Sequence, residues 1–231
     1  RIERQEIYND SSTIDSRGNI VDQTIELYVT IESLEYLSRI TIIHNSNISN
    51  RGDSYSQTIK TLITDESGLN PQEVSYQELT NRAFDSDRNI KNQTILNYLD
   101  SSKALPLDVQ EVRNLSFDSR GNVLLQRIAT YSGILGDPST VLLDVKVIKN
   151  EGLNSLGYAS KVTIWKYAAG SIDDDLSLPG LYDGTIQYYD FMDVTVINTT
   201  QFDLRGNSLI QTITRYSNED STGLIEVQNI S

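Results

Sequence analysis

The residues of this sequence best suited to chemistry occur together in one short motif. The segment FDSRGNVLLQRIATY, which starts at Phe117, holds an Asp, an Arg and a Gly between apolar stretches. A carboxylate and a guanidinium on a glycine-containing loop could form an active site. The motif begins again, however, at Ile14, Phe84 and Phe202. A pattern that recurs along the chain indicates a repeated structural element, and we therefore expect no enzyme activity.

The other candidate reactive groups lack the partners that a site needs. His44 is the only histidine in 231 residues, and no Ser-His-Asp or metal-ligand motif accompanies it. The tripeptide Arg51-Gly52-Asp53 reads as an integrin-type sequence, but it stands where other copies have Arg-Gly-Asn. With 32 acidic residues, chance carboxylate pairs are common and do not indicate glycoside hydrolysis. We expect a surface histidine and an ordinary turn.

One insertion interrupts the repeats and gathers acidic and aromatic residues. It runs GSIDDDLSLPGLYDGTIQYYD, and we expect a loop over residues 168–190. A solvated acidic loop is the simplest interpretation. The alternatives are a calcium site of oxygen ligands and an aromatic sugar-binding platform in residues 170–188. The calcium candidates are Asp173, Asp174, Asp175 and Asp183, and we expect no other cofactor.

Composition excludes several classes of function. The chain has no cysteine, which excludes disulfides, zinc-thiolate sites and cysteine nucleophiles. Its net charge of −13, with only 19 Lys and Arg, argues against binding to nucleic acid or to an anionic membrane. No run of about 18 apolar residues occurs, so we expect no membrane insertion. Frequent Thr, Ile, Val and Tyr, with little helical periodicity, favour strands.

A repeat of about 35 residues organises the chain. Aligned turn positions are separated by 34, 36, 33, 36 and 49 residues, and the longest interval holds the insertion. Extended segments on both sides of each turn indicate a β-hairpin whose three-residue loop ends in a left-handed residue, where glycine is favoured. Arg88 takes the glycine's place in the third copy. The predicted turn glycines are Gly18, Gly52, Gly121, Gly157 and Gly206.

Asparagine and glutamine occupy fixed places in the hairpins. In the second copy, Asn45 with Gln57 and Ile43 with Ile59 both sum to 102, as residues paired in one antiparallel register must. Four of the six hairpins fit such a register, and we expect bulges in the incoming strands of the first and sixth. Buried amides that bond each other would fix the register. The predicted ladder is Asn45, Asn81, Asn114, Asn150, Asn198, Gln57, Gln93, Gln126 and Gln211.

The face of the strands opposite this ladder should meet solvent. In the outgoing strands it carries Asp22, Thr24 and Glu26 in the first copy, and Asn92 and Thr94 in the third. Most Asn-x-Ser/Thr sequons in such an Asn-, Ser- and Thr-rich chain arise by chance. Because Asn92 would lie on the exposed face, it is the candidate for glycosylation.

The motif FDSRGNVLLQ, seen again as IDSRGNIVDQ and FDLRGNSLIQ, resembles the YD repeats of Rhs-type and teneurin-type proteins. The matching turn pairs are Asp15 with Gly18, Asp118 with Gly121, and Asp203 with Gly206. Phe or Ile replaces the family's Tyr, and the likeness covers the six turn regions. The resemblance implies a long spiralling β-sheet in large bacterial secreted or surface proteins, without catalytic residues. The longer period and the amide columns depart from the family's pattern.

We therefore expect an all-β protein of tandem antiparallel β-hairpin repeats that form one elongated, twisted sheet, a solenoid or a barrel-like stack. The expected function is structural, in a segment of an extracellular or cell-surface protein, a fibre or an adhesin stalk. The alternative is a carbohydrate-binding or adhesive module that acts through residues 170–188.

The expected partners are further copies of the chain or its own continuation, because the last strand stops within a hairpin; in the alternative, a glycan is the partner. We expect one array over residues 1–231. Its predicted hairpins span 3–28, 39–62, 74–98, 109–131, 143–167 and 192–216, followed by a strand at 224–231.

Overall fold

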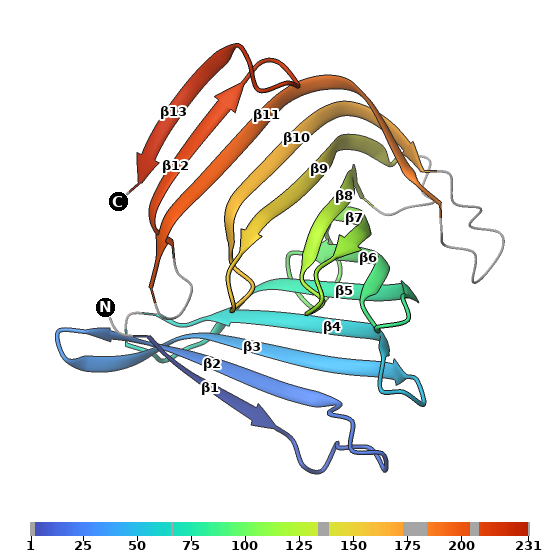
Figure 1. Ribbon diagram of the computed structural model, residues 1–231. Coiled ribbons are helices and arrows are strands. Elements are labelled where there is room, and N and C mark those ends of the chain that lie inside the picture. The colour runs from blue at the N-terminus through green and yellow to red at the C-terminus, as the bar shows by residue number, and fades with distance from the viewer. Residues whose placement is uncertain (1–2, 66, 134–138, 173–183, 204–207, 231) are drawn as a thin grey trace. The chain divides into compact units, whose positions relative to one another are not determined.

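The computed structural model describes residues 3–65, 67–133, 139–172, 184–203 and 208–230. Thirteen strands run through these residues, with no helix among them (Figure 1). Strands that are neighbours in the sheet are neighbours in the chain, so the sheet order is β1 to β13. The registers are antiparallel. The predicted all-β class, built from successive antiparallel hairpins, is confirmed.

The strands form six hairpins and one further strand. They are β1 (Glu3–Asn9), β2 (Asp22–Ile31), β3 (Leu34–Ile48), β4 (Ser54–Ile63), β5 (Gln72–Phe84), β6 (Ile90–Tyr98), β7 (Pro106–Phe117), β8 (Val123–Ser132), β9 (Val141–Leu153), β10 (Ala159–Ile172), β11 (Ile186–Phe202), β12 (Ser208–Tyr216) and β13 (Leu224–Ile230). The predicted hairpins coincide with these pairs of strands, although several strands are longer than predicted.

Internal contacts group the chain into two compact units. The first contains residues 1–82, 93–109 and 133–139, and therefore includes β1 to β4. The second contains residues 83–92, 110–132 and 140–231, and therefore includes β8 to β13. The sequence predicted a single array, whereas packing divides the residues of β5, β6 and β7 between the two units.

The core of the second unit lies on the face opposite the predicted ladder. Its buried cluster consists of Ala129, Val145, Val147, Tyr167 and Ile186. On β9, Val145 and Val147 alternate with Ile148 and Asn150, so the aliphatic and amide side chains point to opposite faces. The prediction that this opposite face meets solvent is wrong in this unit, because β8 to β11 bury their valines and aromatic rings there.

The first unit contains few fully buried apolar side chains. Among its described residues, they are Val29, Tyr98 and Val109. Its tight β2–β3 turn places Glu32 and Ser33 at φ 50° and 71°, and two successive left-handed residues are typical of a type I′ hairpin turn.

Two local features differ from their predicted form. β10 continues to Ile172 and β11 begins at Ile186, and these two residues pair, so residues 168–172 and 186–190 are strand rather than loop. The bulge predicted in the first hairpin is also wrong. β1 pairs with β2 without a shift, and the extra residues form a turn in which the N–H of Ser12 bonds to the carboxylate of Asp10 at 2.8 Å.

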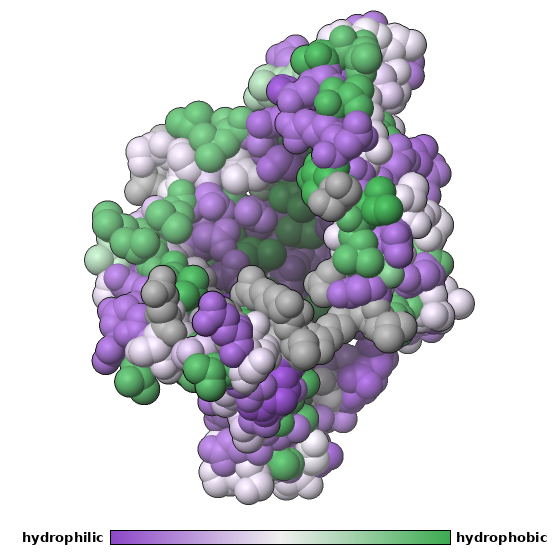
Figure 2. Space-filling model, turned by 90° about the vertical axis from the view of Figure 1, so that its left-hand side faces the viewer, coloured by the Kyte–Doolittle hydropathy of each residue, from purple (hydrophilic) through white to green (hydrophobic). Residues whose placement is uncertain are grey.

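Exposed apolar side chains are dispersed over the surface. On the face shown in Figure 2, hydrophobic residues lie in small groups between polar ones. Single exposed apolar residues of this kind are normal on protein surfaces and mark no docking site by themselves. In the part of the chain that the structure describes, no helix has the length and apolar character needed to cross a membrane.

Candidate functional site

The acidic residue of the repeated motif caps its own turn. Asp118 Oδ1 accepts hydrogen bonds from the backbone N–H groups of Arg120 and Asn122, each at 2.9 Å. Its Oδ2 accepts a third bond from the Asn122 side chain at 2.9 Å. Asp15 and Asp85 make the same three bonds in their turns. The loop therefore uses each carboxylate to hold its own backbone, which is a structural role.

These hydrogen bonds lower the pKa of all three carboxyl groups. For Asp15, Asp85 and Asp118 the largest cause is the side-chain bond from the asparagine four positions later, and backbone N–H groups add to it. An acid whose pKa is pushed further below neutrality is poorly matched to proton transfer near pH 7. The motif thus has the electrostatics of a turn cap.

The second and fifth turns reach the same geometry with uncharged groups. Ser49 Oγ accepts from the N–H groups of Arg51 and Asp53, at 3.1 and 3.0 Å, and donates to the Asp53 carboxylate at 3.1 Å. Asn154 Oδ1 accepts from two N–H groups of its own loop. The tripeptide from Arg51 is therefore part of a hairpin turn, and Asp53 is only 5% exposed.

The turn glycines adopt the left-handed conformation. The angle φ is 85° at Gly18, 87° at Gly52, 84° at Gly121 and 87° at Gly157. Arg88 adopts 72° without the freedom that glycine has. A Cβ on Gly121 would lie 2.5 Å from Oδ1 of an asparagine in the preceding turn, and one on Gly157 would lie 2.7 Å from the corresponding atom. A larger residue at either position would therefore have to displace the asparagine side chain of the preceding turn. Gly206 lies outside the described residues.

The turn arginines bond to the next turn along the sheet. Arg17 Nη1 donates to the backbone oxygen of Ser49 at 2.8 Å, and Arg120 Nη1 donates to that of Asn154 at 2.7 Å. Each arginine also forms an ion pair with the Asp of its own turn. The Asp-x-Arg-Gly-Asn motif thus shapes one hairpin and joins it to the following one.

We call each hydrogen-bonded pair of a glutamine and the asparagine across its hairpin a rung of the ladder. Rungs are formed in the first three hairpins. Their Gln Nε2 atoms donate to the Oδ1 of the asparagine across the hairpin, at 2.8, 2.8 and 2.6 Å. The pairs are Gln23 with Asn9, Gln57 with Asn45, and Gln93 with Asn81. The register of the second hairpin pairs Asn45 with Gln57, as the arithmetic on the sequence predicted. Asn81 is 7% exposed, so the asparagine of the third pair is buried.

Four of the ladder asparagines also bind the preceding repeat. The Nδ2 atom of each donates to the backbone oxygen two residues after that repeat's turn position. The bonds run from Asn45 to Ile20 at 3.2 Å, from Asn81 to Ser54 at 2.8 Å, from Asn114 to Ile90 at 2.8 Å, and from Asn150 to Val123 at 2.9 Å. At Asn45 and Asn81, one amide thus bonds both to its own hairpin and to the preceding one. The spacing of residues in the repeat does not predict this second bond.

The ladder is incomplete in the last three hairpins. Asn114 Oδ1 is buried without a hydrogen-bond partner, and Gln126 stands opposite Ile148 on the neighbouring β9. In the fifth hairpin, Val162 pairs with Asn150. In the sixth, Gln211 pairs with Thr199 and donates to its Oγ1 at 3.1 Å.

The ladder role predicted for Asn198 is wrong. Asn198 is exposed and pairs with Thr212, on the face opposite Thr199. The cause is a register shift between Thr199 and Gln201, next to the turn. One extra residue between the turn and the ladder position moves the asparagine from one face to the other.

A cavity of about 370 Å³ opens where the ladder is interrupted. Asn150, Val162, Thr199 and Gln211 contribute to its walls. The rings of Tyr158 and Phe202, which also line it, stack with centroids 5.8 Å apart. Smaller side chains at the interrupted rungs thus leave a hollow on the ladder face.

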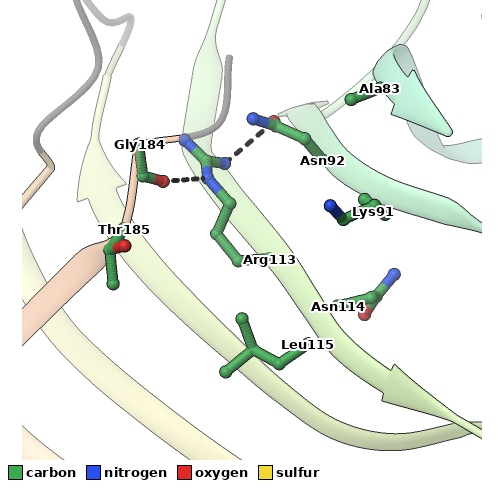
Figure 3. A pocket seen from close by; sticks show the side chains of 8 residues that line it. All are labelled: Ala83, Lys91, Asn92, Arg113, Asn114, Leu115, Gly184 and Thr185. Atoms are coloured by element: carbon green, nitrogen blue, oxygen red, sulfur yellow. Dashed lines mark hydrogen bonds between the residues drawn. The ribbon is translucent and has the colours of Figure 1, made fainter. Parts of the chain in front are cut away.

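Asn92, the predicted glycosylation site, is 1% exposed, and that prediction is wrong. Its Oδ1 accepts a hydrogen bond from Arg113 Nη1 at 2.9 Å (Figure 3). Arg113, 4% exposed, also forms an ion pair with the buried Glu111 at 2.9 Å and donates from Nε to the oxygen of Gly184 at 2.9 Å. A cavity of about 130 Å³ adjoins this network. The charge of Arg113 is thus paired and hydrogen-bonded, which is a structural role. Asn92, buried within this network, is not accessible for glycosylation.

An aromatic cluster occupies the core face of the second unit. Tyr167 is 5% exposed, and its ring centroid lies 4.4 Å from that of Tyr188 and 5.7 Å from that of Phe191. The β12–β13 loop folds onto it, because Trp165 Nε1 donates to the backbone oxygen of Glu219 at 3.1 Å and Tyr167 Oη donates to the Glu219 carboxylate at 2.5 Å. Burial, and then this carboxylate, raise the pKa of Tyr167. Neither the Trp nor the distant loop carries a repeat signal that would have revealed the cluster.

Among the remaining candidates, those within the described residues form no catalytic or metal-binding cluster. His44 is exposed, and its Nδ1 lies 2.6 Å from Asp22 Oδ1. No group of three or more His, Asp and Glu side chains that could hold a metal ion occurs among the described residues. The predicted calcium ligands Asp173, Asp174, Asp175 and Asp183 lie outside those residues.

Comparison with known proteins identifies no family. No family model and no curated protein matches the chain. Among solved structures, the chain is similar to a porin-like protein from Bacteroides uniformis, at 11% identity over 98% of this chain and 93% of that one. The TM-score of 0.18 is too low for this likeness to support an argument about fold or function.

Proposed function

We propose that this chain is a non-enzymatic structural segment of an extracellular or cell-surface protein, such as a fibre or an adhesin stalk. The observation that carries the proposal is the pair of hydrogen bonds made by Asn45 and by Asn81, each of which joins its own hairpin to a backbone oxygen of the preceding one. Repeats joined in series to their neighbours extend along one direction and resist bending, a property that suits a fibre or a stalk.

The turn motif supports the same role. Asp118 bonds to backbone N–H groups of its own loop, and Arg120 bonds to the next turn. The polar residues that might have formed an active site are thus engaged in building and joining hairpins. The likeness of the motif to YD repeats, which occur in large secreted and surface proteins, agrees with this placement.

The sheet also offers an edge for extension. β13 is last in the strand order, and all its side chains are exposed. A further repeat or a second copy of the chain could add a strand there through backbone hydrogen bonds. Self-association or continuation of the array is therefore part of the proposal.

Electron microscopy of the native protein tests the proposal. Rods or fibres are expected, and they should persist when residues 173–183 are replaced by a glycine-serine linker, which leaves β10 and β11 whole. Compact single particles at every concentration would overturn it.

The alternative function, glycan binding through residues 170–188, is favoured by one observation. Tyr188 of β11 lines an aromatic cavity together with Trp165. Glycan-array binding that disappears with the same linker replacement would favour this alternative, whereas binding that survives would separate the cavity from the insertion.

A further inference from the structure

The aromatic cluster borders a cavity of about 370 Å³ on the core face of the second unit. Its lining residues are Leu125, Arg127, Val147, Lys149, Trp165, Tyr167, Tyr188 and Glu219. The registers place Arg127, Val147 and Trp165 in one row across β8, β9 and β10, with Lys149 in the next row. Val147 therefore forms the floor, with a guanidinium at one side and an indole at the other. The cavity falls within the size range of small-molecule sites.

Arg127 gives this cavity an unusual charge. Its Nη1 donates to the backbone oxygen of Ile186 at 2.9 Å, and its guanidinium lies 4.9 Å from the Tyr188 ring centroid. Its Nε is buried without a hydrogen-bond partner, and within the described residues it forms no ion pair. A partly buried cation without a carboxylate is costly, and it is the more notable in a chain of net charge −13.

Lys149 adds a second positive charge at the rim. Its side chain is 48% exposed, and its Nζ lies 2.9 Å from the Glu151 carboxylate. Among the described lining residues the one carboxylate is that of Glu219, which accepts the Tyr167 hydroxyl. The lining thus holds two cations and one carboxylate, and the Arg127 guanidinium has donors to spare for an anionic group.

The opposite wall has the character of a sugar-binding surface. Trp165 is only half-buried, and its Nε1 is fixed by Glu219, which holds the indole in place. A fixed flat ring suits the apolar face of a pyranose, and the remaining carboxylate oxygen of Glu219 can accept a hydroxyl. A flexible acidic peptide would use the cations but not this wall.

We propose that the cavity binds a carboxylated sugar, a uronic acid residue of an acidic polysaccharide. Arg127 and Lys149 bind the carboxylate, and Trp165 packs against the sugar ring. The described residues that line the site belong to β8, β9, β10, the start of β11 and the β12–β13 loop. The proposal does not rest on the structural role proposed above.

Calorimetric titration with trimers of galacturonate, glucuronate and mannuronate tests the proposal. At least one trimer should bind, and the methyl ester of the same trimer should bind about tenfold or more weakly, because it keeps the sugar ring and loses the charge. Binding should also weaken with added salt. Triglutamate should bind more weakly than the best uronate.

Two lysines provide a matched pair of variants. Lys149→Met should weaken binding about three- to tenfold, whereas Lys161→Met should leave it unchanged. Both lysines lie on neighbouring strands, are 48% and 46% exposed and pair with Glu151, but only Lys149 lines the cavity. Trp165→Leu should abolish measurable binding, with circular dichroism checking that the variant folds.

Three results would overturn the proposal. The first is that no uronate trimer binds at concentrations up to about 10 mM, where even a weak site would be partly occupied. The second is equal binding of the trimer and its methyl ester. The third is an equal effect of the two lysine substitutions on binding. Tighter binding of triglutamate would show an acidic-peptide site instead.

Discussion

The rung at Asn81 and the interrupted rung at Asn150 show two outcomes of the same backbone pairing. In both hairpins the asparagine Nδ2 binds a backbone oxygen of the preceding repeat, at 2.8 and 2.9 Å. At Asn81 a glutamine completes the rung at 2.6 Å, and the amide is buried. At Asn150 the facing residue is Val162, and the cavity on the ladder face adjoins both residues.

This difference shows that the interactions that set the strand register are not the same as those that satisfy the polar groups on the ladder face. The fifth hairpin keeps its pairing of Asn150 with Val162 and of Ile148 with Ile164 although the amide pair is lost. Backbone bonds and the aliphatic pair are therefore sufficient for register there. The glutamine contributes by satisfying buried polar atoms, so its loss should matter most where the rung is buried.

The largest effect is expected for Asn81→Leu. The substitution removes the bonds of the buried Asn81 amide to the partly buried Gln93 side chain and to the Ser54 oxygen, and it should lower the free energy of unfolding by about 2–3 kcal/mol. The matched control is Asn198→Leu, in which the same residue type is exposed, and its effect should stay within about 0.5 kcal/mol. Urea unfolding measures both.

Equal losses at the two asparagines would break the comparison, because they would show that ladder bonds contribute no more than a surface amide. A larger loss at Asn198 would restore the ladder position that the repeat arithmetic first assigned to it.

A second effect concerns the turns, which still pack against one another in the hairpins where the ladder is incomplete. Gly121→Ala and Gly18→Ala both place a Cβ at positive φ, which should cost about 1 kcal/mol each. Gly121→Ala should cost about 1 kcal/mol more, because its Cβ would lie 2.5 Å from Asn89 Oδ1, whereas nothing lies within 4 Å at Gly18. Thermal unfolding compares the two. Equal losses would show that neighbouring turns accommodate the added group.

The repeat itself was readable from the sequence, because hairpin register obeys arithmetic. The turn glycines, the pairing of Asn45 with Gln57 and the all-β class follow from local spacing and turn chemistry. Each depends only on residues within one hairpin, where the distance along the chain fixes the distance in space.

Properties that depend on contacts between distant segments were not readable. Asn92 is buried by Arg113 and Gly184, the latter 71 residues from that arginine in the chain. The aromatic cavity needs Glu219, which is 54 residues from Trp165. The prediction for Asn198 was wrong for a local reason. A one-residue shift moves this side chain to the other face of the sheet, but it changes the spacing of apolar residues only slightly.

A smaller effect is expected on acidification. The pKa of Asp118 is lowered in the folded chain, so its stabilising contribution is fully present above the unfolded value of about 4 and is lost as pH falls through the folded pKa. Asp15 and Asp85 behave alike. Replacing all three by Asn, the residue that already caps the fifth turn at Asn154, should flatten the fall of melting temperature below pH about 4. An unchanged slope would place the acid sensitivity elsewhere.

The smallest effect tests whether the interrupted rung can be completed. In Val162→Gln, the new amide would face Asn150 Oδ1 as Gln57 faces Asn45 Oδ1 at 2.8 Å in the second hairpin. One hydrogen bond gained, offset by the lost apolar contact of the valine, should change the free energy of unfolding by about +0.5 kcal/mol. Adding Thr199→Asn should increase the gain, because both interrupted positions border the same cavity. If urea unfolding instead shows that the free energy of unfolding falls by more than about 1 kcal/mol, the cavity walls are already packed around Val162. The fold would then require an apolar residue at this interrupted rung.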